Sequence, residues 1–149
     1  MTTRFPLQPL LDLSRMQLDE ATRKLGRLIA SHQEASQRHQ LLVTYREEYH
    51  ERFVAAAKNG LNPSEWHNYG HFLVRIDEAI AQAEHAVQAT QQHRLDGQKS
   101  WIGKQGRVKA FDTLSDRHVA KLVKKEQRTE QKAGDEHAAR GHREKNSTP

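Results

Sequence analysis

The residues with the most suitable spacing for chemistry are two histidines, His67 and His71, in the stretch HNYGH. Four residues apart, they would share one face of a helix, where two imidazoles could bind a transition metal ion. A zinc enzyme would also need a glutamate after the first histidine and a third ligand, but position 68 is Asn. The chain has no cysteine to supply a thiolate. We therefore expect two exposed histidines, with no metal and no cofactor.

Other catalytic patterns are also missing from the sequence, which has neither a Gly-rich phosphate loop nor a nucleophile elbow. Only 35% of the residues are hydrophobic, and the stretches YREEYHER and KKEQRTEQK mix both signs of charge. This composition favours long, solvated helices over a compact globule. A helical hairpin has no interior pocket for substrate, so we expect a protein that is not an enzyme. No run approaches the ~18 apolar residues of a membrane span, which favours a soluble, unexported chain.

The stretch KNGLNPSEW, residues 58–66, contains the single interruption of the helical pattern, a turn predicted at residues 58–63. Gly60 suits the left-handed position just after a helix end. Asn62 can then cap a second helix, with Pro63 at its first position and Glu65 placed to reach back to the capping backbone N–H. A connection this short predicts two neighbouring antiparallel helices.

Both flanking segments carry an apolar repeat of seven residues, the mark of a coiled coil. At the first of its two seam positions, the large residues are Leu11, Leu18, Leu25 and Phe53 before the turn, and Trp66, Leu73, Ile80, Val87, Trp101, Val108 and Leu122 after it. At the second they include Leu7, Leu28, Leu42, Tyr49, Tyr69, Ile76 and Phe111. Polar residues also fall on the seam, where we expect them to lower stability and to fix the register. These are His32, His39, Arg46, Arg94 and Lys104.

The two repeats can be tested against each other, because folding at the turn pairs residues whose numbers sum to 122. This rule places Ala56 against Trp66, Ala21 against Trp101, Leu25 against Gly97, and Leu11 against Phe111. In most layers a large side chain thus faces a small one, as a packed seam requires. We predict an all-α fold, a long two-helix antiparallel coiled coil over residues 5–125. Residues 126–149 contain no Leu, Ile, Val or Phe and are expected to be frayed or disordered.

One edge of this hairpin, near the turn, combines aromatic and apolar residues. It carries Tyr45, Arg52, Phe72, Ala79 and Ala86, whereas the opposite edge is mostly polar. Two interpretations are equally open. The rings could lie over their own helix pair and widen the seam, or they could form a binding patch for a partner protein.

Three segments resemble the FliJ family of flagellar type III export proteins. They are LLVTYREEYHERF, WHNYGHFLVRIDEAIAQ and SWIGKQGRVKAFDTLSDR, and the resemblance covers roughly residues 7–118. Coiled coils match one another easily, so the heptads alone carry little weight. The most specific part is the W-x-N-Y-x-x-F run from Trp66 to Phe72.

The resemblance implies a non-enzymatic component of the flagellar export apparatus whose fold is similar to the stalk subunit of rotary ATPases. Its expected partners are the export ATPase hexamer, whose assembly and activity it promotes, the cytoplasmic part of the membrane export gate, and export chaperones. The expected location is the cytoplasm, peripheral at the inner face of the cell membrane at the flagellar base, where partners hold it.

The family's gate-binding surface falls here on Leu42, Tyr45, Tyr49, Phe72, Ile76 and Ala79. Arg38 and Ala83 depart from the residues expected around it. The open end of the hairpin, away from the turn, is the expected contact with the ATPase ring. There the candidate residues are Leu7, Leu11, Phe111, Leu122 and Val123.

Two alternatives belong to other classes. The net charge of +5 would suit a nucleic-acid-binding hairpin, similar to the tRNA-binding arm of some synthetases. Acidic residues interrupt almost every basic run, however, so we expect no nucleic acid partner. A coiled coil that pairs with a second chain is also open, although the turn makes pairing within one chain simpler.

Overall fold

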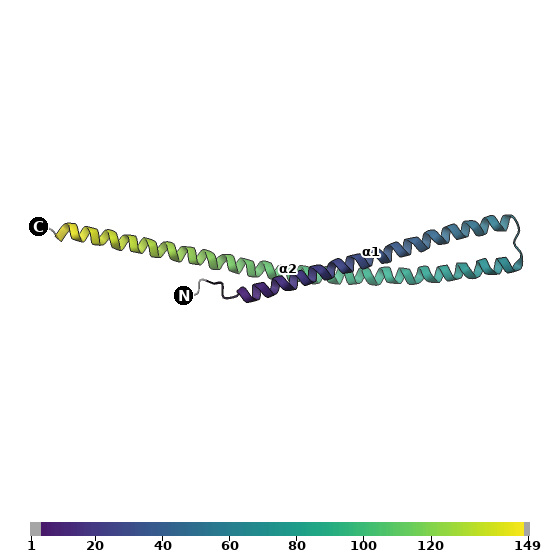
Figure 1. Ribbon diagram of the computed structural model, residues 1–149, viewed down its shortest axis with the longest axis horizontal. Coiled ribbons are helices and arrows are strands. Elements are labelled where there is room, and N and C mark those ends of the chain that lie inside the picture. The colour runs from purple at the N-terminus through teal and green to yellow at the C-terminus, as the bar shows by residue number, and fades with distance from the viewer. Residues whose placement is uncertain (1–3, 148–149) are drawn as a thin grey trace. The chain divides into compact units, whose positions relative to one another are not determined.

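The computed structural model describes residues 4–147 and contains two α-helices, α1 (Gln8–Lys58) and α2 (Pro63–Ser147) (Figure 1). No strand occurs within this range. The predicted all-α helical hairpin is therefore confirmed. The chain divides into two units, which we describe separately. The turn unit is Asp19–Gly103, and the terminal unit is Met1–Leu18 with Lys104–Pro149.

The turn between the helices forms where the sequence predicts it. At the end of α1, Asn59 N donates to Ala56 O and Gly60 N donates to Ala57 O, both at 3.2 Å. These bonds tighten the last turn of the helix. Gly60 then has a φ of 88°, in the left-handed region that glycine enters without steric cost.

Asn62 caps the start of α2. Its Oδ1 accepts a hydrogen bond from Glu65 N at 2.8 Å, and its backbone oxygen accepts the first helical bond from Trp66 N at 3.1 Å. A cap of this kind contributes about 1 kcal/mol. The Glu65 carboxylate, expected to accept from the backbone N–H of the cap, accepts instead from Asn62 Nδ2 at 2.9 Å. The asparagine side chain can accept one bond through its oxygen and donate another through its amide nitrogen.

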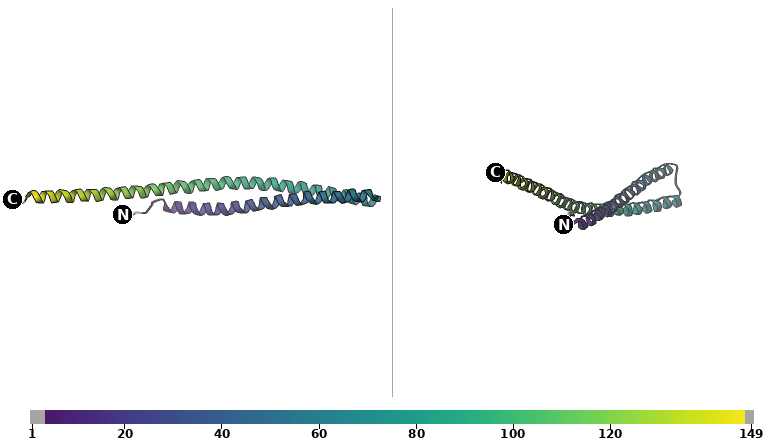
Figure 2. Two further views of the ribbon diagram at one scale, coloured as in Figure 1. Left: turned by 90° about the horizontal axis from the view of Figure 1, so that it is seen from above. Right: turned by 60° about the vertical axis from the view of Figure 1, so that its left-hand side comes forward.

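In the turn unit, the two helices run alongside each other in the left view of Figure 2, and cross-helix contacts establish the register. His32 Nδ1 lies 3.2 Å from Thr90 Oγ1, and the ring centroids of Phe53 and Tyr69 are 5.3 Å apart. Both pairs obey the predicted pairing rule. The hydrogen bond also gives one polar seam residue, His32, a partner on the other helix.

Trp101 finds a polar partner one residue away from its predicted neighbour, Ala21. Its indole Nε1 donates to Thr22 Oγ1 at 2.9 Å. A ring as large as indole spans more than one position of the facing helix, and its N–H requires an acceptor when the ring is partly covered.

Gly97 is the glycine whose missing side chain leaves room for the facing helix. A Cβ atom added there would lie 2.5 Å from Leu28 Cδ1 and 3.6 Å from Leu25 Cδ1, whereas one added at Gly26 or Gly103 would meet nothing within 4 Å. The contact with Leu25 agrees with the predicted pairing. Glycine inside a helix costs about 1 kcal/mol relative to alanine.

We therefore expect different results from alanine at these positions. Gly103→Ala and Gly26→Ala should each raise the free energy of unfolding by about 0.5–1 kcal/mol. Gly97→Ala should gain less, or lose stability, because the Leu28 side chain must move. Urea unfolding followed by circular dichroism measures these changes. An equal gain at all three positions would contradict the packing described for Gly97.

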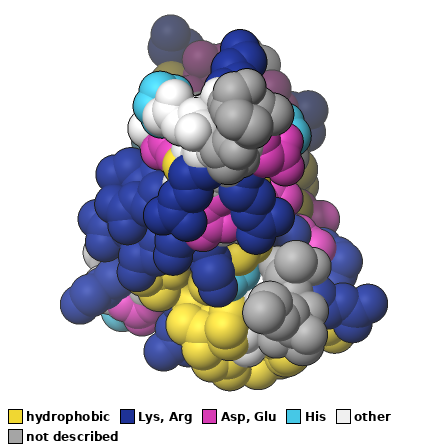
Figure 3. All heavy atoms as spheres, turned by 90° about the vertical axis from the view of Figure 1, so that its left-hand side faces the viewer, with side chains coloured by type: hydrophobic (Ala, Val, Ile, Leu, Met, Phe, Trp, Pro, Cys, Tyr) yellow, Lys and Arg dark blue, Asp and Glu magenta, His cyan; other side chains and the backbone are white. Residues whose placement is uncertain are grey.

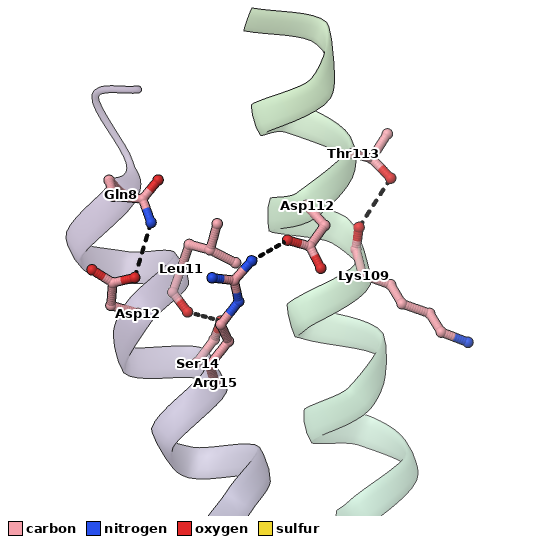
Figure 4. Close-up of polar contacts among 8 residues, drawn as sticks. All are labelled: Gln8, Leu11, Asp12, Ser14, Arg15, Lys109, Asp112 and Thr113. Carbon is pink, nitrogen blue, oxygen red and sulfur yellow. Dashed lines mark hydrogen bonds and ion pairs between the residues drawn. The ribbon is translucent and has the colours of Figure 1, made fainter. Parts of the chain in front are cut away.

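The core of the terminal unit centres on Leu11, which is only 2% exposed, and on Ser14, whose Oγ donates to Leu11 O at 2.8 Å. Figure 4 shows the Leu11 side chain between the two helices. Arg15 of α1 reaches across to α2, where its guanidinium donates to Asp112 Oδ1 at 2.9 Å (Figure 4). The buried leucine fits its predicted seam position.

The C-terminal part of α2 continues as helix through residues 126–147, where the sequence predicts frayed or disordered chain. Every side chain from 123 to 146 is exposed. A helix without tertiary packing is only marginally stable in water, so fraying of this segment stays a prediction. Residues 148–149 of the predicted tail lie outside the described range. Within that range, no helix is both long and apolar enough to cross a membrane.

Candidate protein-binding surfaces

Five aromatic rings from both helices form a continuous cluster next to the turn. The centroid of Tyr49 lies 4.3 Å from that of Phe72 and 5.2 Å from that of Tyr69. Phe53 continues the cluster, 5.3 Å from Tyr69 and 5.0 Å from Trp66. Such tilted and edge-to-face pairs add to the stability that burial alone provides, so the cluster holds the two helices together at this end.

Tyr45 lies at the margin of this cluster. Its ring meets Phe72 edge to face at a centroid distance of 6.1 Å, yet the residue remains 43% exposed. Phe72 is half-buried. Phe72 thus packs over its own helix pair, as the widened-seam interpretation requires. Tyr45 presents ring surface to solvent, and its role as a partner contact stays a prediction.

Tyr49 stays protonated at neutral pH. Partial burial in the ring cluster raises the pKa of its hydroxyl above the ordinary tyrosine value, and the neighbouring Tyr69 and Tyr45 raise it further. This half-buried side chain therefore presents a neutral phenol at the aromatic cluster.

The remaining residues predicted for the gate surface differ in accessibility. Ile76 is 5% exposed and belongs to the core of the turn unit, whereas Leu42 and Ala79 are half-buried. Leu41 was not predicted, yet it is 70% exposed and lines a shallow groove together with Leu42 and Tyr45. An apolar residue at an outer heptad position was the signal that could have revealed it.

An ion pair on the turn unit links Arg46 of α1 to Asp77 of α2. Arg46 Nε donates to Asp77 Oδ1, and a second guanidinium nitrogen lies 3.4 Å from Oδ2. The hydrogen bond to Asp77, followed by the carboxylate charge, raises the pKa of Arg46. Because both groups are partly exposed, the pair orients the helices more than it stabilises them.

The two candidate metal ligands, His67 and His71, do lie together, with ring centroids 4.4 Å apart on the exposed surface of α2. Within residues 4–147, no group of three or more side chains suited to a metal is present. The pair instead borders a shallow surface groove that Trp66, Gly70 and Val74 also line.

The five residues predicted to contact the ATPase ring all belong to the terminal unit. Leu11 is buried, so it can support such a surface but cannot contact a partner directly. Phe111 and Leu122 are half-buried, whereas Leu7 is 36% exposed and Val123 is 47% exposed. The four accessible residues could provide apolar contacts to another protein.

Further apolar side chains of this unit are exposed, at heptad positions outside the seam. They are Leu10, Leu13, Met16, Leu114 and Val119. In the end-on view of Figure 3, yellow hydrophobic side chains and dark-blue Lys and Arg side chains are both visible at the surface. Exposed apolar side chains that gather into one patch are typical of protein interaction sites.

Comparison with known proteins identifies the family. The family described as Flagellar FliJ protein matches residues 3–147. The Flagellar FliJ protein of Salmonella typhi is 35% identical over 136 residues, which cover 90% of this chain and 91% of the relative. That of Escherichia coli (strain K12) is 29% identical over 134 residues, again 90% and 91% of the two chains. With nearly its whole length matched, the chain belongs to the FliJ family of flagellar proteins.

Proposed function

We propose that this chain is a non-enzymatic component of flagellar type III protein export. It acts as a stalk-like coiled coil that binds the export ATPase hexamer and promotes its assembly and activity. The observation that carries the proposal is the family match, which extends over residues 3–147 and is not confined to the heptads. The helical hairpin is the fold that such a stalk requires.

The terminal unit supplies the proposed contact with the ATPase ring. Leu7, Phe111, Leu122 and Val123 offer accessible apolar surface, and Leu11 holds α1 against α2 beneath them. Beyond residue 122, α2 has no buried side chain up to residue 146. The last large apolar side chains of α2, Leu122 and Val123, gain packing when they enter the apolar hole of a ring, because the ring supplies contacts that the chain itself lacks there.

The turn unit supplies the proposed contact with the cytoplasmic part of the export gate. Tyr45 is the strongest candidate anchor, because its ring is exposed and is held in position by Phe72. Aromatic side chains fixed before binding lose little entropy when a partner covers them. The surface around Tyr45 is shaped and supported by Leu42, Tyr49, Ile76 and Ala79. Export chaperones are the third class of proposed partner.

These contacts imply a location in the cytoplasm, peripheral at the inner face of the cell membrane at the flagellar base. Protein partners hold the chain there according to this proposal.

The direct test is to add the purified protein to its cognate export ATPase. We expect the rate of ATP hydrolysis and the fraction of assembled hexamer to rise together, the first measured by phosphate release and the second by mass photometry. An unrelated antiparallel coiled coil of similar length serves as the control. If neither quantity rises above that control, the chain is not an ATPase-binding stalk.

A further inference from the structure

The C-terminal part of α2 carries a basic face that the proposed stalk function does not explain. It consists of Arg117, Lys121, Lys124, Lys125, Arg128 and Lys132. At 3.6 residues per turn, all six fall within an arc of about 100° and extend over about 22 Å of helix. The acidic residues of the same stretch, Glu126 and Glu130, lie on nearly the opposite side.

These six cations have no acidic partner within the described part of the chain. All six side chains are exposed, and the two ion pairs described above, both on other residues, do not involve them. The spacing brings like charges together at intervals of four residues, as in Lys124, Arg128 and Lys132. Like charges at this interval destabilise a helix. The arrangement therefore has a cost in the isolated chain that a bound anionic surface would remove.

Four of the six cations, Lys124, Lys125, Arg128 and Lys132, follow the last large apolar residue of α2, and this indicates which kind of anion they would bind. From residue 124 to residue 146 there is no Leu, Ile, Val, Met or aromatic side chain. Specific protein interfaces bury a core of apolar and aromatic residues, and this part of α2 offers none of these. A lipid bilayer with anionic headgroups needs none of them, because each Lys or Arg near its surface contributes attraction independently.

The one-sided distribution of charge supports the same choice. A helix inside the ATPase ring would have protein on all sides, so cations on one face could interact with only part of that surface. A flat, anionic surface is contacted on one side only, which leaves Glu126 and Glu130 facing away from it. We infer that the basic face of α2 binds the headgroups of anionic phospholipids directly, which would give the chain a membrane contact of its own besides those through partner proteins.

The test uses the full-length protein and sucrose-loaded vesicles, with no other protein present. The chain should sediment with vesicles of phosphatidylcholine containing about one quarter phosphatidylglycerol. It should remain in solution with pure phosphatidylcholine. Binding to the anionic vesicles should weaken steeply as salt is raised, because the contact is electrostatic and exposed.

Two double variants distinguish the contribution of the basic face to vesicle binding from the contribution of the net charge. Lys124→Gln with Arg128→Gln should lower the partition coefficient about 30-fold, because each cation contributes about fivefold. Lys99→Gln with Lys109→Gln removes the same charge at exposed positions outside the face and should change binding by less than about threefold. Circular dichroism of both variants checks that the helices are retained.

Equal losses in the two variants, or no sedimentation with anionic vesicles, would overturn the inference. So would a result in which vesicles fail to bind but a short DNA duplex binds and the Lys124 and Arg128 variant loses that binding, since the face would then belong to a nucleic acid site. The assay contains no ATPase, so its outcome is independent of the proposed stalk function.

Discussion

Removal of all residues after Arg117 should abolish stimulation of the export ATPase while leaving gate binding largely intact. The truncation deletes Leu122 and Val123, the apolar residues of α2 proposed to enter the ring, together with the basic segment that follows them. The aromatic cluster and its cross-helix contacts belong to the turn unit and are not touched. ATP hydrolysis and gate binding, measured on the same truncated preparation, check this result.

Two further variants locate the effect. A chain that ends after Lys125 keeps both apolar residues and should retain most of the stimulation. Leu122→Glu with Val123→Glu in the full-length chain should reduce stimulation about tenfold or more, because two charges would have to enter an apolar contact. If the chain that ends at Arg117 still stimulates fully, and changes at the turn remove the effect instead, the orientation of the stalk is the reverse of the one proposed.

Replacement of Tyr45 by alanine should weaken binding to the cytoplasmic part of the export gate about 30-fold and reduce motility to match. Tyr45 combines an exposed ring with a fixed orientation against Phe72, which is the usual character of an interface residue with a large energetic contribution. Isothermal titration calorimetry and swimming assays measure the two effects. Val74→Ala, at a 55% exposed position of α2, is the matched control and should leave both unchanged.

Phe72→Ala should also weaken gate binding, but with a loss of stability that Tyr45→Ala does not share. If both residues were only partner contacts, as the sequence suggests, alanine at either position would leave thermal unfolding nearly unchanged. The ring of Phe72, however, lies 4.3 Å from that of Tyr49, so its removal opens space in the cluster. We expect a cost of about 1–3 kcal/mol. Wild-type binding and motility in Tyr45→Ala, or unfolding of the hairpin by that change, would contradict the gate surface.

The sequence by itself determined the architecture of this chain, because the signals concerned are local. Glycine at position 60 and the Asn-Pro cap end one helix and begin the next whatever lies further along the chain. The seven-residue repeat then fixes which face of each helix is apolar. Once the turn position is known, pairing follows by counting, which is why the contacts of His32 with Thr90 and of Leu25 with Gly97 were predictable.

The tertiary structure decided which atoms meet and which side chains remain accessible. Trp101 donates a hydrogen bond to Thr22, the chain neighbour of its predicted partner Ala21. Phe72 packs on Tyr49, while Tyr45 remains exposed. Counting along a helix gives the layer of a residue, but the length and rotamer of each side chain determine how far it reaches across the seam. Burial depends on those choices in both helices at once, so the accessible part of each binding surface appears only when the two helices are packed together.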